Sequence, residues 1–244
     1  MNINNYFIKK TIIKWYDSNK RDLPWRKKVN NKKDLAYRIL ISEIMLQQTT
    51  VNTVKEKYVE FIKKWPTLEH LSKSPQKQLL TFWSGLGYYK RAINLYKNVK
   101  IIKKNFNSIV PKNEEELLSL PGIGKYTALA ILAIAYKKPV IAVDSNIIRI
   151  ITRIYALNSP ITKINNIIEQ RAQSFIFKDR PGDMVQSLMD FGSLVCKPRN
   201  PTCHNCVISK NCLAFKKNLV HKIPIKKKIL LKQKKNKVCI SLCY

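Results

Sequence analysis

Apolar side chains recur at helical spacing along most of this 244-residue chain. Leu35, Ile39 and Leu46 fall on one face of an expected helix, and the same period recurs over 54–65 and 93–102. The alternating pattern of a β-strand, bounded by Asn-Gly or Gly-Gly turns, is missing from the sequence. Seven prolines fall between the periodic segments, where they can begin or end helices: Pro66, Pro75, Pro111, Pro121, Pro139, Pro160 and Pro181. The pattern predicts an all-α protein without internal repeats.

The charge of the chain indicates a polyanionic partner. There are 46 Lys and Arg against 15 Asp and Glu, a formal net charge of +31, whereas the 45% of hydrophobic residues is ordinary for a globular protein. Nucleic acid is the first candidate and an anionic membrane the second. The longest uncharged apolar stretch, Tyr126 to Tyr136, is too short to span a bilayer, and the first 20 residues lack the apolar core of a secretory signal. We expect a cytoplasmic, nucleoid-associated monomer that does not bind membranes.

The basic residues are concentrated toward the C-terminus. Between Phe191 and Tyr244 the sequence has thirteen basic residues and no acidic one. Residues 216–237 have the composition of a solvated basic tail, which fits a flexible extension at least as well as a specific DNA contact. We therefore expect the folded body to end near Lys216.

Four cysteines with the spacing C-x6-C-x2-C-x5-C indicate a metal centre: Cys196, Cys203, Cys206 and Cys212. Four thiolates within 17 residues can surround one centre. Zinc ribbons usually pair two C-x2-C knuckles, and this sequence has one such knuckle. The irregular spacing favours a [4Fe-4S] cluster over zinc or over four unligated buried cysteines. Cys239 and Cys243 lie in the tail and are interpreted as plain thiols.

The segment Leu120 to Lys125, LPGIGK, predicts a helix-hairpin-helix motif. Gly122 and Gly124 permit a tight turn, and the backbone N–H groups at the start of the next helix can then face a phosphate. A plain connection between two helices is the alternative interpretation. The basic charge of the chain favours DNA binding by this hairpin.

Two acids differ from the other acids because apolar residues precede or surround them. Glu43 stands among Leu40, Ile41, Ile44 and Met45, and Asp144 follows an apolar run. Removal from water raises the pKa of a carboxyl group, so that it can stay protonated near neutral pH. Asp144 could equally serve as a helix N-cap, and Glu43 could extend to the surface. Both residues are candidates for acid catalysis.

A glycine loop at 85–91, GLGYYKR, is a candidate contact to nucleic acid. Its glycines permit close backbone approach, Leu86 and Tyr88 could wedge between bases, and Lys90 and Arg91 could contact phosphates. A tyrosine pair packed in the core beside a loop is the alternative.

In combination these segments resemble the helix-hairpin-helix DNA glycosylases of the endonuclease III superfamily and, within it, the MutY-type adenine DNA glycosylases. The resemblance covers about Trp15 to Pro224. The matching segments, in the order of the family, are RDLPWR at 21–26, SEIMLQQT at 42–49, the loop at 85–91, the hairpin, VDSN at 143–146 and the four-cysteine loop. Ser145 departs from the family, which usually has Gly there.

The resemblance implies two helical lobes. The expected units are an N-terminal helix (1–28) that packs with the later lobe, a central module (29–137) with the hairpin at 114–135, and a C-terminal lobe (138–215) with the cluster loop at 196–212. Residues 216–244 are expected to be a basic tail or the start of a truncated C-terminal domain. The chain ends where the family's 8-oxoguanine-recognition domain would begin, so we expect that domain to be absent.

The resemblance also assigns roles to single residues. Glu43 would donate a proton to adenine, and Asp144 would stabilise the positive sugar, beside Tyr126 and Asn146 as further catalytic residues. Residues expected to contact the substrate DNA near the lesion are Arg26, Gln47, Gln48, Thr49, Leu86, Tyr88 and Gln186. Residues expected to contact the DNA backbone are Gly122, Gly124, Lys125, Lys90, Arg91, Lys197 and Arg199.

The implied activity is removal of adenine mispaired with 8-oxoguanine or guanine in double-stranded DNA. Endonuclease III itself carries a lysine nucleophile just after the hairpin, and here Tyr126 holds that position. The sequence therefore favours a monofunctional glycosylase over a bifunctional glycosylase/lyase. A catalytically weak DNA-binding remnant is a further alternative, against which the retained Glu43 and Asp144 argue.

Overall fold

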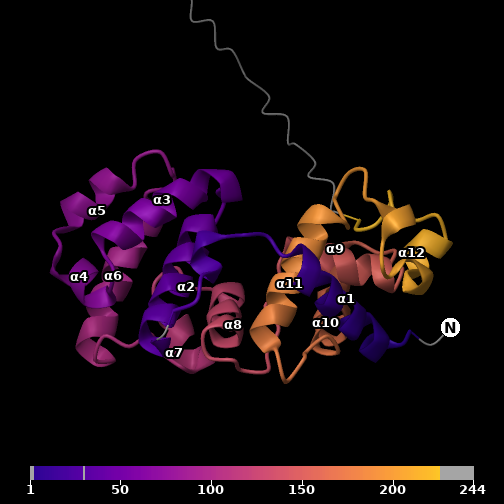
Figure 1. Ribbon diagram of the computed structural model, residues 1–244, viewed down its shortest axis with the longest axis horizontal. Coiled ribbons are helices and arrows are strands. Elements are labelled where there is room, and N and C mark those ends of the chain that lie inside the picture. Colours follow the sequence, from indigo (N-terminus) through magenta and orange to yellow (C-terminus); the bar gives the residue numbers. More distant parts are fainter. Residues whose placement is uncertain (1–2, 30, 226–244) are drawn as a thin grey trace, which may run out of the picture.

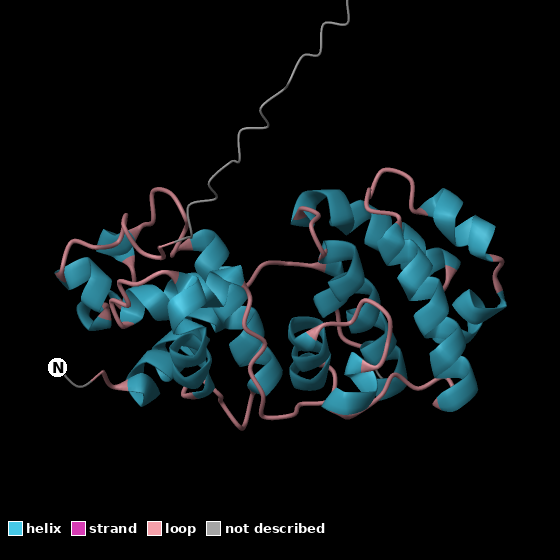
Figure 2. Cartoon of the chain, turned by 180° about the vertical axis from the view of Figure 1, so that it is seen from behind, coloured by secondary structure: helices cyan, strands magenta, loops and turns pink. Residues whose placement is uncertain are grey.

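The computed structural model describes residues 3–29 and 31–225, and every regular element in these ranges is a helix (Figures 1 and 2). The helices form two lobes that lie side by side. The first lobe contains α2 (Lys32–Leu46), α3 (Val51–Lys64), α4 (Leu68–Lys73), α5 (Gln76–Phe82), α6 (Lys90–Asn105), α7 (Glu114–Leu118) and α8 (Lys125–Ile134). The second lobe contains α1 (Asn5–Asn19), α9 (Ser145–Ile154), α10 (Ile161–Gln173), α11 (Pro181–Leu194) and α12 (Leu213–Lys216). Short 3-10 turns are η1 (Pro24–Arg26), η2 (Cys203–Asn205) and η3 (Ser209–Asn211). The prediction of an all-α fold with two helical lobes is confirmed.

Short polar side chains fix where the important helices begin. The side chains of Asn31 and Thr50 accept backbone N–H groups at the starts of α2 and α3. Asp144 caps α9 in the same way, and Pro181 occupies the first turn of α11, where its missing N–H costs nothing. The caps therefore set the register in which each helix presents its residues to the site.

Each lobe has its own apolar core. The first core includes Leu40, Phe61 and Trp83, all nearly free of solvent contact. The second includes Ile12 of α1 together with Phe191 of α11. Figure 1 shows the indigo N-terminal helix beside the orange C-terminal helices, so the chain starts in the second lobe, crosses to the first and returns.

Helix α8 belongs to both lobes. Its Ile131 lies in the first core, whereas Ala130 and Ala133 lie in the second. Gly182 of α11 permits the close packing, because a Cβ atom there would lie 2.9 Å from the carbonyl oxygen of Ala133. The junction between the lobes is thus a tight contact of α8 with α11, and the candidate catalytic residues lie around it.

The ordered body extends beyond the predicted end at Lys216. Val220 and Ile223 form a third small core with Ala214, and Arg153 donates to the carbonyl oxygen of Ile223 at 3.0 Å. Residues 217–225 therefore pack on α9, because buried apolar side chains and a buried arginine hold them. The rest of the predicted tail, with Cys239 and Cys243, lies outside the described residues.

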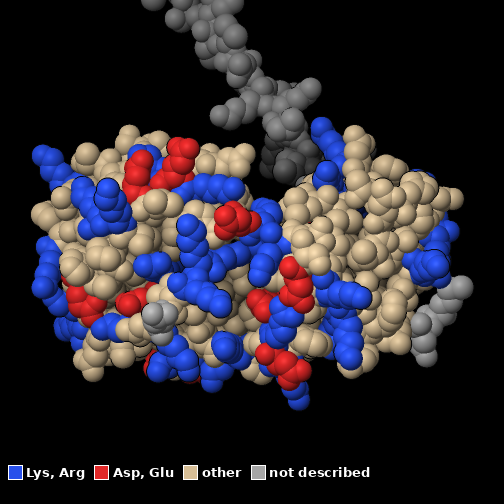
Figure 3. Space-filling view, in the orientation of Figure 1, with Lys and Arg blue, Asp and Glu red and all other residues tan. Residues whose placement is uncertain are grey.

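Lys and Arg side chains cover much of the surface. Figure 3 shows them far outnumbering Asp and Glu on one face, mainly over the first lobe and the junction. Within the described ranges, no helix combines the length and the apolar character needed to cross a membrane.

We expect Gly182→Ala to lower the free energy of unfolding by about 1–3 kcal/mol, since the added methyl group would overlap the backbone of α8. Urea titration followed by circular dichroism measures the change. Gly124→Ala is the control, because a Cβ atom there would have no neighbour within 4 Å and its φ is −94°. Equal unfolding free energies for the two variants would contradict the tight contact of α8 with α11.

Candidate active site

Two carboxyl groups and a phenol meet where the lobes join. Glu43 lies in the last turn of α2, Tyr126 in the first turn of α8, and Asp144 directly before α9. The Tyr126 side chain lies beside the Glu43 carboxyl and lowers its pKa, and the charge of Asp144 acts on both groups. The fold therefore brings together three residues that lie on different helices and far apart in the sequence.

Glu43 is only 7% exposed although it is an acid. Burial raises the pKa of its carboxyl to about 7, and repulsion from Asp144 adds to the rise, whereas Tyr126 and Arg26 oppose it. Burial and the two nearby carboxyls also raise the pKa of Tyr126 far above its ordinary value, so its hydroxyl stays protonated. Near neutral pH a large fraction of Glu43 is therefore a neutral acid that can give up a proton.

Asp144 is held in one orientation. Its Oδ1 accepts the backbone N–H of Ile147 at 2.7 Å, and its Oδ2 accepts the Asn146 side chain at 2.6 Å. Burial raises the pKa of the Asp144 carboxyl, while these hydrogen bonds act in the opposite direction because they stabilise the charged form. The cap of α9 and the candidate catalytic carboxylate are thus the same group.

A chain of hydrogen bonds leads from Asp144 to the cysteine loop. Arg149 is buried and donates to the side-chain oxygen of Asn146, to the carbonyl oxygen of Gly192 and to that of Cys196, each at 2.7 Å. A Cβ atom on Gly192 would lie 2.6 Å from the Cβ of Asn146, so glycine is required for α11 to approach this closely. The position of Asp144 consequently depends on α11 and on the cysteine loop.

A small cavity of about 50 Å³ opens beside Glu43. Apolar side chains form most of its wall, and polar groups enter it from both lobes. The polar side chains that line it are Arg21, Arg26, Glu43, Tyr126 and Gln186. A concave, mostly apolar pocket with a few convergent polar groups is typical of a ligand site.

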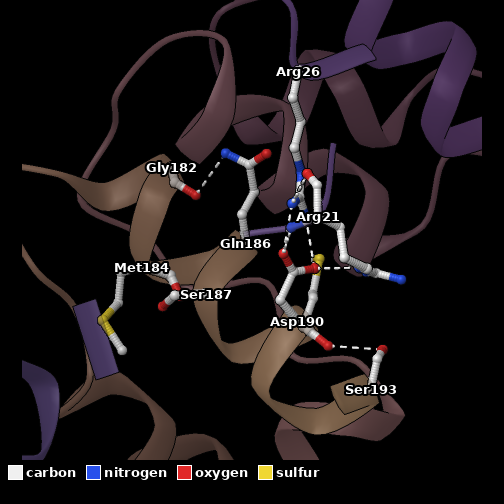
Figure 4. A network of polar contacts seen from close by, with 9 residues as sticks. Arg21, Arg26, Gly182, Met184, Gln186, Ser187, Asp190 and Ser193 are labelled. Atoms are coloured by element: carbon white, nitrogen blue, oxygen red, sulfur yellow. Dashed lines mark hydrogen bonds and ion pairs between the residues drawn. The ribbon is translucent and has the colours of Figure 1, made fainter. Parts of the chain in front are cut away.

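The arginines of this wall are fixed by a buried carboxylate, Asp190 of α11 (Figure 4). Arg26 binds it with two nitrogens, at 2.6 and 3.0 Å, and Arg21 binds it at 2.7 Å. Burial alone would raise the pKa of Asp190, but the hydrogen bonds and charges of Arg26 and Arg21 outweigh burial, and the pKa lies below its ordinary value. Gln186 projects from α11 beside this group, with a single donated bond of 3.3 Å to the carbonyl oxygen of Gly182.

The hairpin joins α7 to α8 beside the end of α2. Gly122 has a φ of +77°, and a Cβ there would lie 2.6 Å from the Asn94 amide nitrogen. Gln47 donates to the carbonyl oxygen of Gly122 at 3.3 Å, which links α2 to the hairpin. Gly124 begins α8 without a side-chain cap. Lys125 is exposed and forms an ion pair of 2.8 Å with Glu169 of the other lobe.

Most of the residues predicted to contact DNA are on the surface. Gln48, Lys90, Lys197 and Arg199 are exposed, and Tyr88 is 62% exposed. Gln48 and Tyr88 both adopt positive φ, 58° and 45°.

Two residues differ from their predicted surface roles. Leu86 is 4% exposed because its side chain packs into the first core, so it does not project toward a base. Arg91 is 8% exposed, and its guanidinium turns inward to five oxygen atoms of the protein. We therefore replace the predicted phosphate contact of Arg91 with a structural role.

The four cysteines of the predicted cluster loop line a single cavity of about 30 Å³. Arg153 of α9 reaches the Cys196 sulfur at 3.4 Å and the Lys197 carbonyl oxygen at 2.7 Å. In the described part of the chain, no three His, Cys, Asp or Glu side chains are placed to hold one metal ion.

Comparison with known proteins agrees with this geometry. Residues 41–174 match the family model of the HhH-GPD superfamily base excision DNA repair proteins. The chain belongs to this superfamily. Among individual relatives of the chain, an adenine DNA glycosylase of Buchnera aphidicola (subspecies Schizaphis graminum) is 40% identical over 94% of the chain and 66% of its own length. An adenine DNA glycosylase of Rattus norvegicus is 38% identical over 86% of the chain and 42% of its own length. The chain thus spans about two fifths to two thirds of these relatives.

A solved structure has a similar fold. The structure of a thermostable thymine-DNA glycosylase superposes with a TM-score of 0.78 and 29% identity, over 87% of the chain and 97% of its own length.

Sequence reasoning missed the buried polar residues that hold the superfamily fold together here. Asp190, Arg149 and Arg153 are each less than 9% exposed and are fully engaged in hydrogen bonds or ion pairs across elements. Asp190 interrupts the apolar run of α11, which is a usable signal. Arg149 and Arg153 lie on the polar side of the amphipathic helix α9, so its periodicity gives no sign that they are buried.

The raised pKa of Glu43 predicts a pH-dependent stability. The folded protein binds the carboxyl proton more tightly than the unfolded chain, so the free energy of unfolding falls as the pH rises from about 4.5 to about 7. Glu43→Gln removes this loss, and we expect the variant to be about 1–3 kcal/mol more stable than wild type at pH 8 but not at pH 4.5. Urea titrations at both pH values measure the difference. A gain of equal size at both pH values would show that Glu43 titrates normally.

Proposed function

We propose that this chain is a monofunctional DNA glycosylase that hydrolyses the bond between adenine and deoxyribose, where adenine is mispaired with 8-oxoguanine or guanine. The observation that carries the proposal is the buried Glu43 with a pKa near 7, facing a cavity and lying near a fixed carboxylate. The names of the relatives, adenine DNA glycosylases, support it.

The two carboxyl groups suit the two halves of this reaction. Adenine leaves as a poor anion unless it is protonated, so neutral Glu43 gives its proton to the base as the bond to the sugar breaks. The sugar then carries oxocarbenium character, which the Asp144 carboxylate stabilises. Water adds to the sugar carbon and loses a proton to Glu43, which restores the acid.

The cavity beside Glu43 is proposed to receive the adenine after it leaves the base stack, since neither carboxyl can reach a base inside a duplex. Arg26 lines this cavity and is proposed to contact the base from one side. The Gln186 amide can both donate and accept at the other side of the base.

DNA is proposed to bind across the hairpin and the exposed basic residues. The uncapped start of α8 at Gly124 presents backbone N–H groups to a phosphate, and Lys90, Lys197 and Arg199 add positive charge. Gln48 and Tyr88 are proposed to contact the strand opposite the adenine. Affinity should then fall steeply with salt.

A lyase activity is disfavoured by the same geometry. Tyr126, not lysine, faces Glu43, and a phenol cannot form a Schiff base with the sugar. Lys125 lies outside the cavity wall and is paired with Glu169. Borohydride should therefore trap no covalent complex with DNA.

The four cysteines fit a [4Fe-4S] cluster. Their side chains line one cavity, and the irregular C-x6-C-x2-C-x5-C spacing favours a cluster over the paired C-x2-C knuckles of a zinc ribbon. Cys196, Cys203, Cys206 and Cys212 would hold the cluster. When bound, it would cross-link the loop that carries Lys197 and Arg199 and so hold these cations in place for phosphates.

Glu43→Gln should slow adenine release at least about 100-fold while leaving duplex affinity nearly unchanged, because the proton is removed and the shape is kept. Single-turnover assays with alkali cleavage, on duplexes with adenine opposite 8-oxoguanine, guanine or thymine, measure the rate. Wild type should cleave the first two, with a rate that falls above about pH 7 as Glu43 loses its proton. Glu56→Gln, the same change on the exposed surface of α3, is the matched control. Wild type that binds duplex but releases no base would instead support the DNA-binding remnant.

Protein purified without oxygen should contain iron and sulfide near four per chain, as expected for a four-cysteine [4Fe-4S] site. Cys206→Ser should lower both contents and the stability of the second lobe. Fully active protein that contains zinc and no iron would refute the cluster.

A further inference from the structure

We propose that Arg91 is a positioning residue that fixes the two loops facing the opposite strand relative to the helix that carries Glu43. The inference rests on the proposed function and extends it: one buried guanidinium would connect recognition of the opposite base with proton delivery. Each of its two terminal nitrogens serves a different part of this connection.

The first nitrogen holds the end of α2. The Nη1 of Arg91 donates to the carbonyl oxygens of Ile44 at 3.1 Å and Met45 at 2.7 Å. These carbonyls lie in the last turn of the helix, where backbone acceptors lack helical partners and a positive charge is favourable. Glu43 directly precedes Ile44, so Arg91 fixes the backbone that carries the acid.

The second nitrogen holds both loops. The Nη2 of Arg91 donates to the Thr49 hydroxyl at 2.9 Å and to the carbonyl oxygens of Leu86 at 2.7 Å and Gly87 at 3.2 Å. Thr49 follows Gln48, and Gly87 precedes Tyr88. Both exposed neighbours adopt positive φ, a strained conformation that persists only where surrounding contacts impose it.

Aromatic rings complete the arrangement. The guanidinium lies over the rings of Trp83, at 5.5 Å, and Tyr88, at 5.6 Å, and the Trp83 indole donates to the Gly87 carbonyl oxygen at 3.1 Å. A planar cation with two forked nitrogens can satisfy all of these contacts at once, whereas the single ammonium group of lysine cannot. A shift of either loop therefore has to disturb bonds that also fix the end of α2.

The test compares Arg91→Lys, which keeps the charge but not the fork, with Thr49→Val, which removes one acceptor at a half-buried position. Lys97→Gln, an exposed change on the same helix, is the control. One readout is the ratio of single-turnover rates for adenine opposite 8-oxoguanine and opposite guanine. The second is the fluorescence of 2-aminopurine placed beside the mispair, which reports unstacking and requires no base removal.

We expect Arg91→Lys to lower the single-turnover rate of adenine release at saturating enzyme about tenfold. The ratio of the rates opposite 8-oxoguanine and opposite guanine should become smaller, and the 2-aminopurine fluorescence should rise less on binding than with wild type. Thr49→Val should reduce the rate ratio less than Arg91→Lys does. The double variant should have the same rate and the same rate ratio as Arg91→Lys, because both changes break the same connection. Lys97→Gln should match wild type. If wild type releases no adenine, the proposed function is refuted. The fluorescence comparison between wild type and Arg91→Lys then still tests the role of Arg91, because it requires no base removal.

The inference is overturned if Arg91→Lys keeps the wild-type rate ratio and fluorescence, or if its effect adds fully to that of Thr49→Val. Should thermal melting show that Arg91→Lys is unfolded, Thr49→Val alone decides: an unchanged ratio and unchanged fluorescence then refute the connection.

Discussion

An acid that keeps its proton near neutral pH must be withdrawn from water, and yet it must reach the group that it protonates. Glu43 meets both conditions because it lies at the junction of two lobes and not inside either core. One lobe supplies the helix that carries it, and the other supplies Asp144. Helix α8 packs into both cores and brings Tyr126 to the carboxyl. Because the chain passes from one lobe to the other and back, residues of both lobes can meet at Glu43.

Arginines with little solvent exposure connect the helices and loops around this junction. Arg26 binds Asp190, Arg91 binds the end of α2, and Arg149 and Arg153 bind the cysteine loop. Each buried guanidinium is costly to remove from water unless its N–H groups find acceptors, so each one demands a defined arrangement of carbonyls or carboxylates around it. Removing such an arginine would leave those acceptors unpaired, which is why these positions are sensitive although they need not touch DNA.

The sequence was sufficient for the parts of the structure that local physics determines. Helical periods and the possible cap at Asp144 predicted helices, and the unusual surroundings of Glu43 identified it as a candidate acid. The sequence failed to predict the direction in which certain side chains point. Leu86 and Arg91 were assigned to the DNA surface because loop composition says nothing about which way a side chain turns. Asp190 escaped notice because its partners, Arg21 and Arg26, come from the opposite end of the chain.

The placement of the acids completes the electrostatic picture of this basic protein. With 15 acids against 46 basic residues, acids that lie near the candidate DNA surface are notable. Two arginines pair with Asp190, hydrogen bonds from Ile147 and Asn146 occupy the oxygens of Asp144, and burial favours the protonated form of Glu43. The positive surface can then attract any DNA regardless of sequence. Selectivity then has to arise from the residues that line the cavity beside Glu43 and from the loops at Gln48 and Tyr88.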